Sequence, residues 1–493
     1  MSDWKPAADH SPSEAIRGGA VVALSRIGRQ VITLCITILL ARLLTPAEFG
    51  AVAVITALVA LGLVLQQAGL SSATVQRERV STQAISTMFW INAAFGLTLT
   101  VLFAVLADPI ASFLKHPELE VLCQATSVTF VLNGLTVQHR ALLQRSMRFG
   151  TTARIDIGSA LCGGLCAIAV AVAGYGYWAL VAQVLVSDAL ALLMLLPSVR
   201  WSLTRPVLTG EVREMVAFGG SLLGFSLVVT AANNLHVVLL GRGAGTTAVG
   251  IYTRAYALAS VPQNLLQGAA AYVALPKLAR AHRDEEGLAD FYYGSVQLLC
   301  LVALPVALAF ALFGDQIALI VYGAQWGDVA EVLRIFAVGL AVTPLLHSTG
   351  PVLLARGEPH RMFRWGVFGA CVILAGTLVG LRWGITGVAC GWSTTTVLLL
   401  LPCLVYCLRG TGLTVRGLGR AVGGIYGAAA CALPAGWLAR HTLADLPSLV
   451  ALPLGLGFTL LVYIGLCYVA FGQQALIQKV IRRLLPRPGR TAE

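Results

Sequence analysis

The sequence predicts an all-α protein that crosses a membrane many times, and three observations lead to this prediction. Hydrophobic residues make up 57% of the 493 residues and charged residues 11%, whereas about 25% of the residues in ordinary soluble domains are charged. The mean hydropathy is +0.82. Long apolar runs separated by short polar turns recur along the chain, which is the pattern of a polytopic membrane protein.

A window of about 19 residues gives about fourteen candidate spans, each long enough to cross the hydrocarbon core as a helix. They cover residues 17–43, 47–70, 83–107, 120–140, 152–173, 177–197, 214–240, 248–275, 289–313, 330–354, 363–382, 385–408, 418–438 and 448–471. The turns between them are short, so no loop is long enough to fold as a soluble domain. The function is therefore expected inside the membrane or at its surfaces.

A weak internal repeat relates the first two spans to a segment 200 positions later. Residues 39–42 and Gly50 match residues 239–242 and Gly250, and further identities extend to Gln67 and Gln267. Internal repeats are common in membrane transporters. We predict two related six-helix lobes that each begin with a helical hairpin. Their expected ranges are 1–205 and 206–410, with two accessory spans and a basic cytoplasmic tail at 411–493.

The distribution of basic residues predicts the orientation. Most of the 34 Lys and Arg residues fall on the side of the N-terminus, and such an excess marks cytoplasmic loops. Both termini are therefore predicted to be cytoplasmic, with Lys115 on the opposite side. The net charge of +12 is a topology and lipid-headgroup signal, and nucleic acid is not an expected partner. The segment 1–14 lacks the basic cap and cleavage site of a signal peptide.

Two arginines lie inside the first span. The uninterrupted apolar run at 31–41 is shorter than the roughly 20 residues that a span needs, so the helix must extend back through Arg29 and Arg26. Their i, i+3 spacing places both side chains on one helix face. An intramembrane charge usually faces a protein cavity and marks a pathway. The alternative is that these side chains extend to the aqueous interface.

The seventh and eighth spans hold a second polar group. Arg254 lies one to two turns into the membrane from the outer side, and with Arg29 it would form a cationic ladder. The alternative is that Arg254 extends outward to water. Asn233, Asn234 and His236 cluster late in the seventh span, where they would bind sugar hydroxyls or a proton. A hydrogen-bond network between helices is an equally good explanation.

Asp188 is the only carboxylate near the middle of a predicted span. Asp156 is expected near the cytoplasmic edge beside Arg154, and Glu331 near the outer edge beside Arg334. A central carboxylate is a candidate for ion or proton coupling. The alternative is a structural role as the buried partner of an arginine, and the two roles are compatible.

The sequence contains no motif of an enzyme. It has no Walker A motif, no GxSxG and no HExxH, so neither catalysis nor a cofactor is expected. The eleven cysteines fall in or at the ends of apolar runs. No His or carboxylate accompanies them in a spacing that would make a metal site. They are interpreted as small hydrophobic residues, and neither a metal nor a disulfide is expected.

Four segments resemble the bacterial polysaccharide-transport family. They are residues 39–50 (LLARLLTPAEFG), 142–149 (LLQRSMRF), 176–183 (GYWALVAQ) and 234–262 (NLHVVLLGRGAGTTAVGIYTRAYALASVP). The family contains Wzx-type flippases of lipid-linked oligosaccharides, within the multidrug/oligosaccharidyl-lipid/polysaccharide exporter superfamily, and the greatest likeness is to colanic-acid-type exporters. The resemblance covers residues from about 15 to 470. Relatives commonly have Asn-x-Asp where this chain has Asn234-Leu235-His236.

The resemblance implies a V-shaped pair of lobes that work by alternating access in the bacterial inner membrane. The implied cargo is an undecaprenyl-pyrophosphate-linked oligosaccharide for exopolysaccharide or lipopolysaccharide synthesis. Membrane lipids and polysaccharide polymerase and export proteins are the implied partners. The residues expected to meet pyrophosphate and sugars are Arg26, Arg29, Arg254, Asn233 and Asn234, and those expected to serve ion coupling are Asp188 and His236.

Two rival functions remain open. An ion-coupled multidrug extruder of the same superfamily would prefer cationic drugs and an acidic cavity, and the buried arginines argue against that. A membrane-embedded glycan polymerase or ligase would carry a large outer loop with catalytic basic residues. The loops of this chain are short, which argues against the second rival.

Overall fold

The computed structural model describes residues 3–4, 12–67, 74–75, 77, 80–199, 201, 203–281, 285–471 and 474. Side chains are described in these ranges apart from 3–4, 12–24, 26–27, 67, 218–222, 225, 263–281, 285–288 and 355. The sequence also predicts a short surface helix at residues 473–483, with a solvated tail as the alternative, and this segment lies almost wholly outside the described residues. Contacts divide the chain into two compact units, residues 1–253 and 254–493. The predicted lobes end at 205 and 410, and these boundaries remain a prediction.

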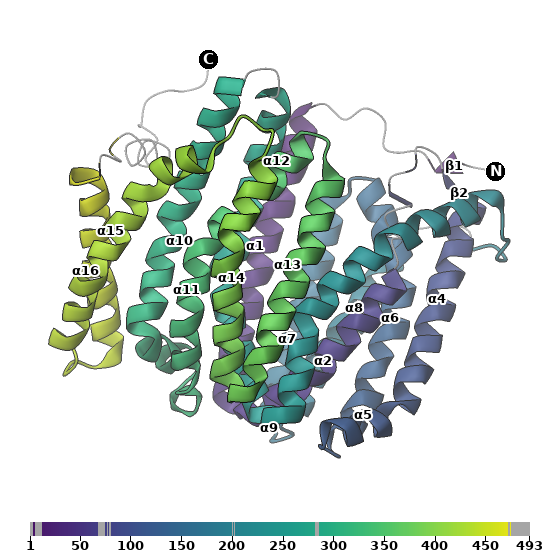
Figure 1. The fold of residues 1–493 in the computed structure, drawn as a ribbon. Coiled ribbons are helices and arrows are strands. Elements are labelled where there is room, and N and C mark those ends of the chain that lie inside the picture. Colours follow the sequence, from purple (N-terminus) through teal and green to yellow (C-terminus); the bar gives the residue numbers. More distant parts are fainter. Residues whose placement is uncertain are drawn as a thin grey trace, which may run out of the picture. The chain divides into compact units, whose positions relative to one another are not determined.

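The first unit consists of long helices and two very short strands (Figure 1). Strand β1 (Asp3–Trp4) pairs antiparallel with β2 (Val80–Ser81). The helices are α1 (Pro12–Leu43), α2 (Pro46–Gln67), α4 (Thr82–Val105), α5 (Ala107–Leu114), α6 (Leu119–Arg145), α7 (Phe149–Val172), α8 (Trp178–Leu195) and the first part of α9 (Gly210–Ala281).

The second unit takes in the rest of α9 and the remaining helices (Figure 1). These are α10 (Glu285–Val321), η1 (Ala324–Trp326), α11 (Val329–His347), α12 (Thr349–Ala355), α13 (Pro359–Gly380), η2 (Leu381–Trp383), α14 (Gly384–Leu408), α15 (Val415–Thr442) and α16 (Ser448–Val469).

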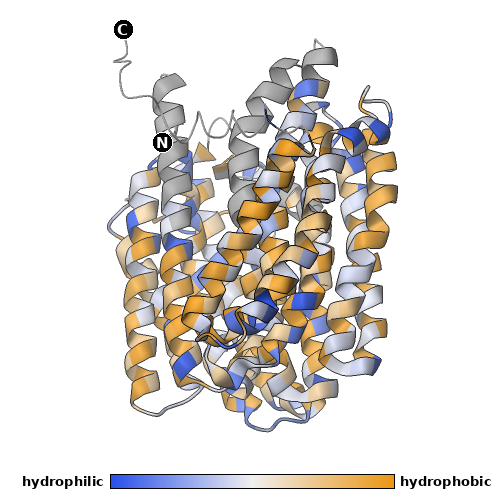
Figure 2. Ribbon diagram, turned by 90° about the vertical axis from the view of Figure 1, so that its left-hand side faces the viewer, coloured by the Kyte–Doolittle hydropathy of each residue, from blue (hydrophilic) through white to orange (hydrophobic). Residues whose placement is uncertain are grey.

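The prediction of an all-α polytopic membrane protein is confirmed. Nine segments of the described chain are long and apolar enough to cross a membrane, and hydrophobic residues cover most of the length of the helices (Figure 2). All fourteen predicted spans fall on helices. The count of fourteen is nevertheless approximate, because α9 contains both the seventh and eighth spans and α11 with α12 forms the tenth.

Local sequence explains where the helices of the hairpins begin and end. Helix α2 starts with a capping box, in which the Thr45 amide donates to Glu48 Oε2 at 2.7 Å and the Glu48 amide donates to Thr45 Oγ1 at 3.3 Å. In the second repeat, α9 is interrupted at Gly245, whose φ of 84° is a conformation that glycine adopts without strain. Both copies of the repeated motif therefore contain a break in the helix.

The segment before α9 is fastened to α4. The Trp90 indole donates to the carbonyl of Thr204, and Thr87 exchanges hydrogen bonds with the backbone of Val207. At the start of α9, Glu211 accepts from the Ser81 hydroxyl and Glu214 forms an ion pair with Arg77. These bonds explain why the first unit continues past residue 205.

A hydrogen bond and two ion pairs in the second unit join α10 to later helices. Pro305 removes an amide from α10, and the freed carbonyl of Leu301 accepts from the Tyr463 hydroxyl of α16. Near the end of α10, Asp315 pairs with Arg334 of α11 and Arg440 of α15. Arg334 therefore pairs with a carboxylate of an antiparallel neighbour and not with Glu331, which lies near it in sequence.

Candidate functional site: a charged cluster and an aromatic cluster

Four charged residues gather between helices of the first unit, and we call them the charged cluster: Arg29, Arg140, Asp156 and Asp188. They lie on α1, α6, α7 and α8, and α7 packs against both α1 and α8. An Arg140 guanidinium nitrogen donates to Asp156 Oδ1 at 2.7 Å. The charges of Arg140 and Arg29 both act on Asp188. The cluster therefore holds two positive and two negative groups when all four are ionised.

Within this cluster, Arg29 and Asp188 are the least constrained members. Arg29 is exposed and Asp188 is half-buried. Among the described side chains, neither takes part in an ion pair shorter than 4 Å. The Arg29 guanidinium is therefore accessible and not held by a described carboxylate. Arg26 lies in α1 too, but its side chain falls outside the described residues.

The sequence did not single out Arg140 as a site residue. The fourth span was predicted to end at residue 140, whereas α6 continues to Arg145 and α7 begins at Phe149. The short turn makes Arg140 and Asp156 neighbours across an antiparallel pair. Arg154, which was expected to lie beside Asp156, is exposed and contacts the Gly150 carbonyl of its own helix. The available signal was opposite charges flanking a turn.

The polar residues late in the seventh span make mainly local bonds. Asn234 donates to the Thr230 carbonyl at 2.9 Å, and Nδ1 of His236 lies 3.2 Å from the Ala232 carbonyl. The His236 ring is buried and packs edge-on against Tyr252, with centroids 5.4 Å apart. Asn233 is exposed. The structure does not place these three residues in the charged cluster, and their proposed roles stay predictions.

Arg254 belongs to the second unit, where aromatic side chains surround its helix. Its carbonyl accepts a hydrogen bond from the Tyr322 hydroxyl at 3.2 Å, and its side chain is half-buried.

Two residues further along α9, Tyr256 contacts Phe336 of α11 and Trp392 of α14, with centroids 5.9 and 6.1 Å apart. We call these three residues the aromatic cluster. Gly339 leaves the space that the Trp392 ring occupies, since an added Cβ would lie 2.4 Å from it. Tyr256 is 40% exposed, so its ring forms the accessible part of the cluster.

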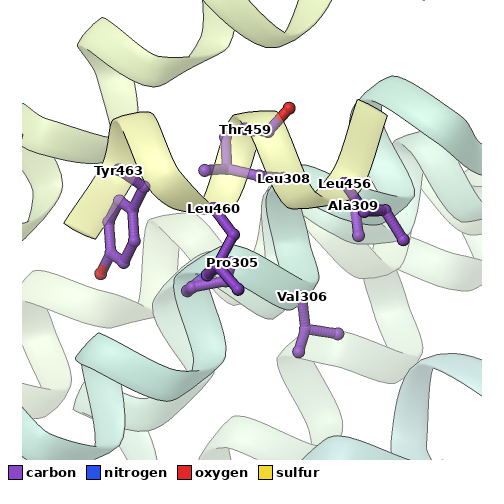
Figure 3. Close-up of a pocket in the computed structure, with 8 residues that line it drawn as sticks. All are labelled: Pro305, Val306, Leu308, Ala309, Leu456, Thr459, Leu460 and Tyr463. Atoms are coloured by element: carbon purple, nitrogen blue, oxygen red, sulfur yellow. The ribbon is translucent and has the colours of Figure 1, made fainter. Parts of the chain in front are cut away.

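A cavity of about 220 Å³ lies between α10 and α16 (Figure 3). Pro305, Val306, Leu308 and Ala309 line it from α10, and Leu456, Thr459, Leu460 and Tyr463 line it from α16. None of these side chains is charged. This cavity fits apolar groups and offers no donor set for a pyrophosphate.

Comparison with solved structures identifies the fold. The chain superimposes on the lipid II flippase MurJ in its inward closed conformation with a TM-score of 0.70 and 12% identity, over 93% of this chain and all of that one. A multidrug resistance MATE transporter of the MOP superfamily in an inward-facing conformation gives a TM-score of 0.61 and 16% identity, over 77% of this chain and 97% of that one. At such identities the likeness concerns the fold.

Curated relatives carry names from polysaccharide synthesis. The lipopolysaccharide biosynthesis protein WzxC of Escherichia coli K12 is 25% identical over 73% of this chain and 74% of its own length. The succinoglycan biosynthesis transport protein ExoT of Rhizobium meliloti is 27% identical over 70% and 74%. The teichuronic acid biosynthesis protein TuaB of Bacillus subtilis is 27% identical over 60% of this chain, and the match spans 62% of TuaB. A family model described as "Polysaccharide biosynthesis protein" matches residues 39–331, more than half of the chain, and the chain therefore belongs to that family.

Proposed function

We propose that this protein is a flippase that moves undecaprenyl-pyrophosphate-linked oligosaccharides across the bacterial inner membrane, from the cytoplasmic to the outer leaflet. The observation that carries the proposal is the charged cluster. Arg29 lies on α1, in a segment that the sequence predicts to span the membrane. It is exposed and has no ion pair with a described carboxylate. A guanidinium forms paired hydrogen bonds with phosphate oxygens. The relatives named for polysaccharide synthesis and transport support the same conclusion.

The cluster suggests how an anionic cargo is held and released. With Asp188 ionised, the two arginines and two aspartates carry no net charge. Binding of a proton at Asp188 gives the cluster a net charge of +1, which strengthens its attraction for pyrophosphate. Loss of that proton restores neutrality and favours release. In this proposal Asp188 couples the strength of cargo binding to protonation.

The second unit supplies complementary chemistry in this proposal. Arg254 adds a second cation for the pyrophosphate, and the exposed face of Tyr256 offers a flat surface on which the apolar side of a sugar ring packs. Asn233 and Asn234 add donors and acceptors for sugar hydroxyls. The polyprenyl tail stays in the lipid. Both termini are cytoplasmic, as the distribution of Lys and Arg predicts.

The multidrug rival is less favoured because its cationic substrates require a surplus of negative charge. The charged cluster has no such surplus, and the aromatic cluster lies next to an arginine. The polymerase or ligase rival also finds no support, because family relatives carry names of biosynthesis and transport proteins and the two solved structures compared above are of a flippase and a transporter.

Reconstitution of the full chain in liposomes tests the proposal. A labelled undecaprenyl-pyrophosphate-linked oligosaccharide is placed in the membrane, and a lectin added outside measures how fast the sugar becomes accessible. We expect faster exposure than in protein-free liposomes and inhibition by free pyrophosphate. Movement of a cationic dye without movement of the lipid-linked sugar would instead favour the multidrug extruder.

A further inference from the structure

The repeated glycines of the two hairpins contact each other in the first unit. A Cβ added to Gly50 would lie 1.7 Å from the carbonyl oxygen of Thr246, and a Cβ added to Gly250 would lie 1.9 Å from the carbonyl oxygen of Pro46. These distances are far below any real Cβ contact, and both obstacles are backbone atoms. Only glycine allows the start of α2 and this part of α9 to approach so closely.

The contact is reciprocal. The offset that relates the two copies of the repeat takes Pro46 to Thr246 and Gly50 to Gly250. Gly50 packs against Thr246, and the equivalent residue Gly250 packs against Pro46, the equivalent of Thr246. A contact in which residue i meets j and j meets i is the signature of a two-fold axis. A local two-fold axis thus passes between Gly50 and Gly250.

A second contact holds the same part of α9. The Arg242 guanidinium donates to the Phe113 carbonyl of α5 at 2.8 Å and lies 4.1 Å from the centre of the Phe113 ring. One turn into α2 from Gly50, Val54 is fully buried and occupies the space that a Cβ on Gly241 would need. Residues 241–250 are therefore closed against α2 and α5 at the end of the helices that is predicted to face outward.

We propose that the contact between Gly50 and Gly250 is the outer gate of the transport pathway, closed in this structure, and this inference rests on the proposed function. The gate is made of Cα–H groups and carbonyls, a geometry that gives weak hydrogen bonds. At Gly50 and Gly250 the nearest atoms across the contact are backbone atoms, so the helices part and return there without side-chain repacking. Because the contact lies on the local axis, a movement that separates the two repeats breaks both halves of it together.

The test measures access to the buried layer under the gate and does not require transport. Val54→Cys is introduced into the full chain, and cells are treated with an impermeant thiol reagent. Labelling at residue 54 is then quantified by peptide mass spectrometry. Gly250→Ala is expected to increase the labelling rate about tenfold, which corresponds to a shift of about 1.4 kcal/mol toward the open gate. Gly243→Ala is the matched control, since a Cβ there meets nothing within 4 Å, and it is expected to change nothing.

Two further variants make each outcome decisive. Arg242→Gln removes the contact with Phe113 and adds no atom between the two glycines. It is expected to raise the labelling rate at residue 54 about threefold. This variant tests the gate if Gly250→Ala does not fold. Unchanged labelling in folded Gly250→Ala, or in Arg242→Gln when that variant alone folds, overturns the gate. Lys115→Cys, which should label from outside, and Arg416→Cys, which should not, check the orientation. Normal gate labelling together with failed liposome transport would reject the proposed function and keep the gate.

Discussion

The two units place their charges differently. In the first unit, Arg29, Arg140, Asp156 and Asp188 meet between four helices. In the second unit, the ion pairs of the described residues lie near helix ends, as between Asp315 and Arg440. The described side chains near Arg254 are aromatic.

The difference suggests a division of labour. A cargo with a charged linkage and an uncharged glycan needs both kinds of surface, and each unit presents one of them. Substitutions on the two surfaces should therefore affect different parts of the cargo, and the predictions below begin with the one expected to have the largest effect.

Removing an arginine that is proposed to bind the pyrophosphate should have the largest effect. We expect Arg29→Ala to weaken cargo binding roughly ten- to hundredfold, because a lost charge-assisted hydrogen bond costs about 1.5–3 kcal/mol. Arg29→Lys should recover only part, since Lys keeps the charge but loses the bidentate geometry. Arg254→Ala and Arg254→Lys should behave in the same way. Binding of the lipid-linked sugar and its transport in liposomes are the measurements.

Arg154→Ala is the matched control, because this exposed arginine bonds only to its own helix among the described contacts. Full activity of Arg29→Lys and Arg254→Lys would mean that both side chains simply reach the interface. Normal transport by both Ala variants would remove the arginines from the cargo site.

The aromatic cluster should contribute less and should act on the sugar. Tyr256→Ala is expected to weaken binding roughly two- to tenfold, since aromatic packing is worth about 0.5–1.5 kcal/mol. Tyr256→Phe keeps the ring and should bind normally. Trp383→Ala, an exposed tryptophan in η2, serves as the control. A lipid-linked cargo that carries only its first sugar keeps the pyrophosphate and lacks most of the glycan, so comparing it with the full cargo separates the two surfaces. If Tyr256→Ala weakens binding of both cargos equally, the division of labour is wrong.

The sequence predicted the fold class well because burial in lipid demands long apolar helices. It predicted the site less well. Asp188 was singled out because it interrupts an apolar run, whereas Arg140 was predicted to be the last residue of its span because the helical turns that follow it are polar. Span boundaries follow hydropathy, and α6 extends beyond its apolar part.

Contacts between distant residues lay beyond the sequence pattern. The repeat identified Gly50 and Gly250 as equivalent, but equivalence does not reveal that two residues touch, because that depends on where the local axis passes. Arg334 likewise found Asp315 on another helix. Tertiary packing decides such pairs, and a single sequence carries no direct signal for it.

Asp188 offers a finer test of the charged cluster. Asp188→Asn mimics the protonated side chain and gives the cluster a net charge of +1. We expect cargo to bind about fivefold more tightly, because a unit charge about 4 Å away contributes about 1 kcal/mol even in bulk water. Release, and therefore transport, should slow. Binding should also lose its dependence on pH. Asp108→Asn, an exposed carboxylate of α5, is the control, and unchanged affinity in Asp188→Asn would leave Asp188 as a structural partner.

The smallest effect is expected at the edge of the second unit, where Glu358 accepts a hydrogen bond from Arg361 at 2.5 Å and lies 3.6 Å from Arg356. The Arg361 guanidinium lowers the pKa of the Glu358 carboxyl below its usual range. A carboxyl whose pKa is lower in the folded state stabilises the fold at every pH above its unfolded pKa of about 4.3. That contribution is lost as the pH falls through the folded pKa.

Glu358→Gln should therefore lower the unfolding temperature slightly at pH 7, and the difference from the unsubstituted protein should vanish as the pH falls below the usual range of a glutamate. The effect is small because water screens the exposed pair. Thermal unfolding in detergent between pH 7 and 3 measures it. Transport at pH 7 should be unchanged, since no cargo contact is proposed here. A transport defect as large as that of Arg29→Ala would show that charges at helix ends also serve the cargo, and the contrast between the two units would then fail.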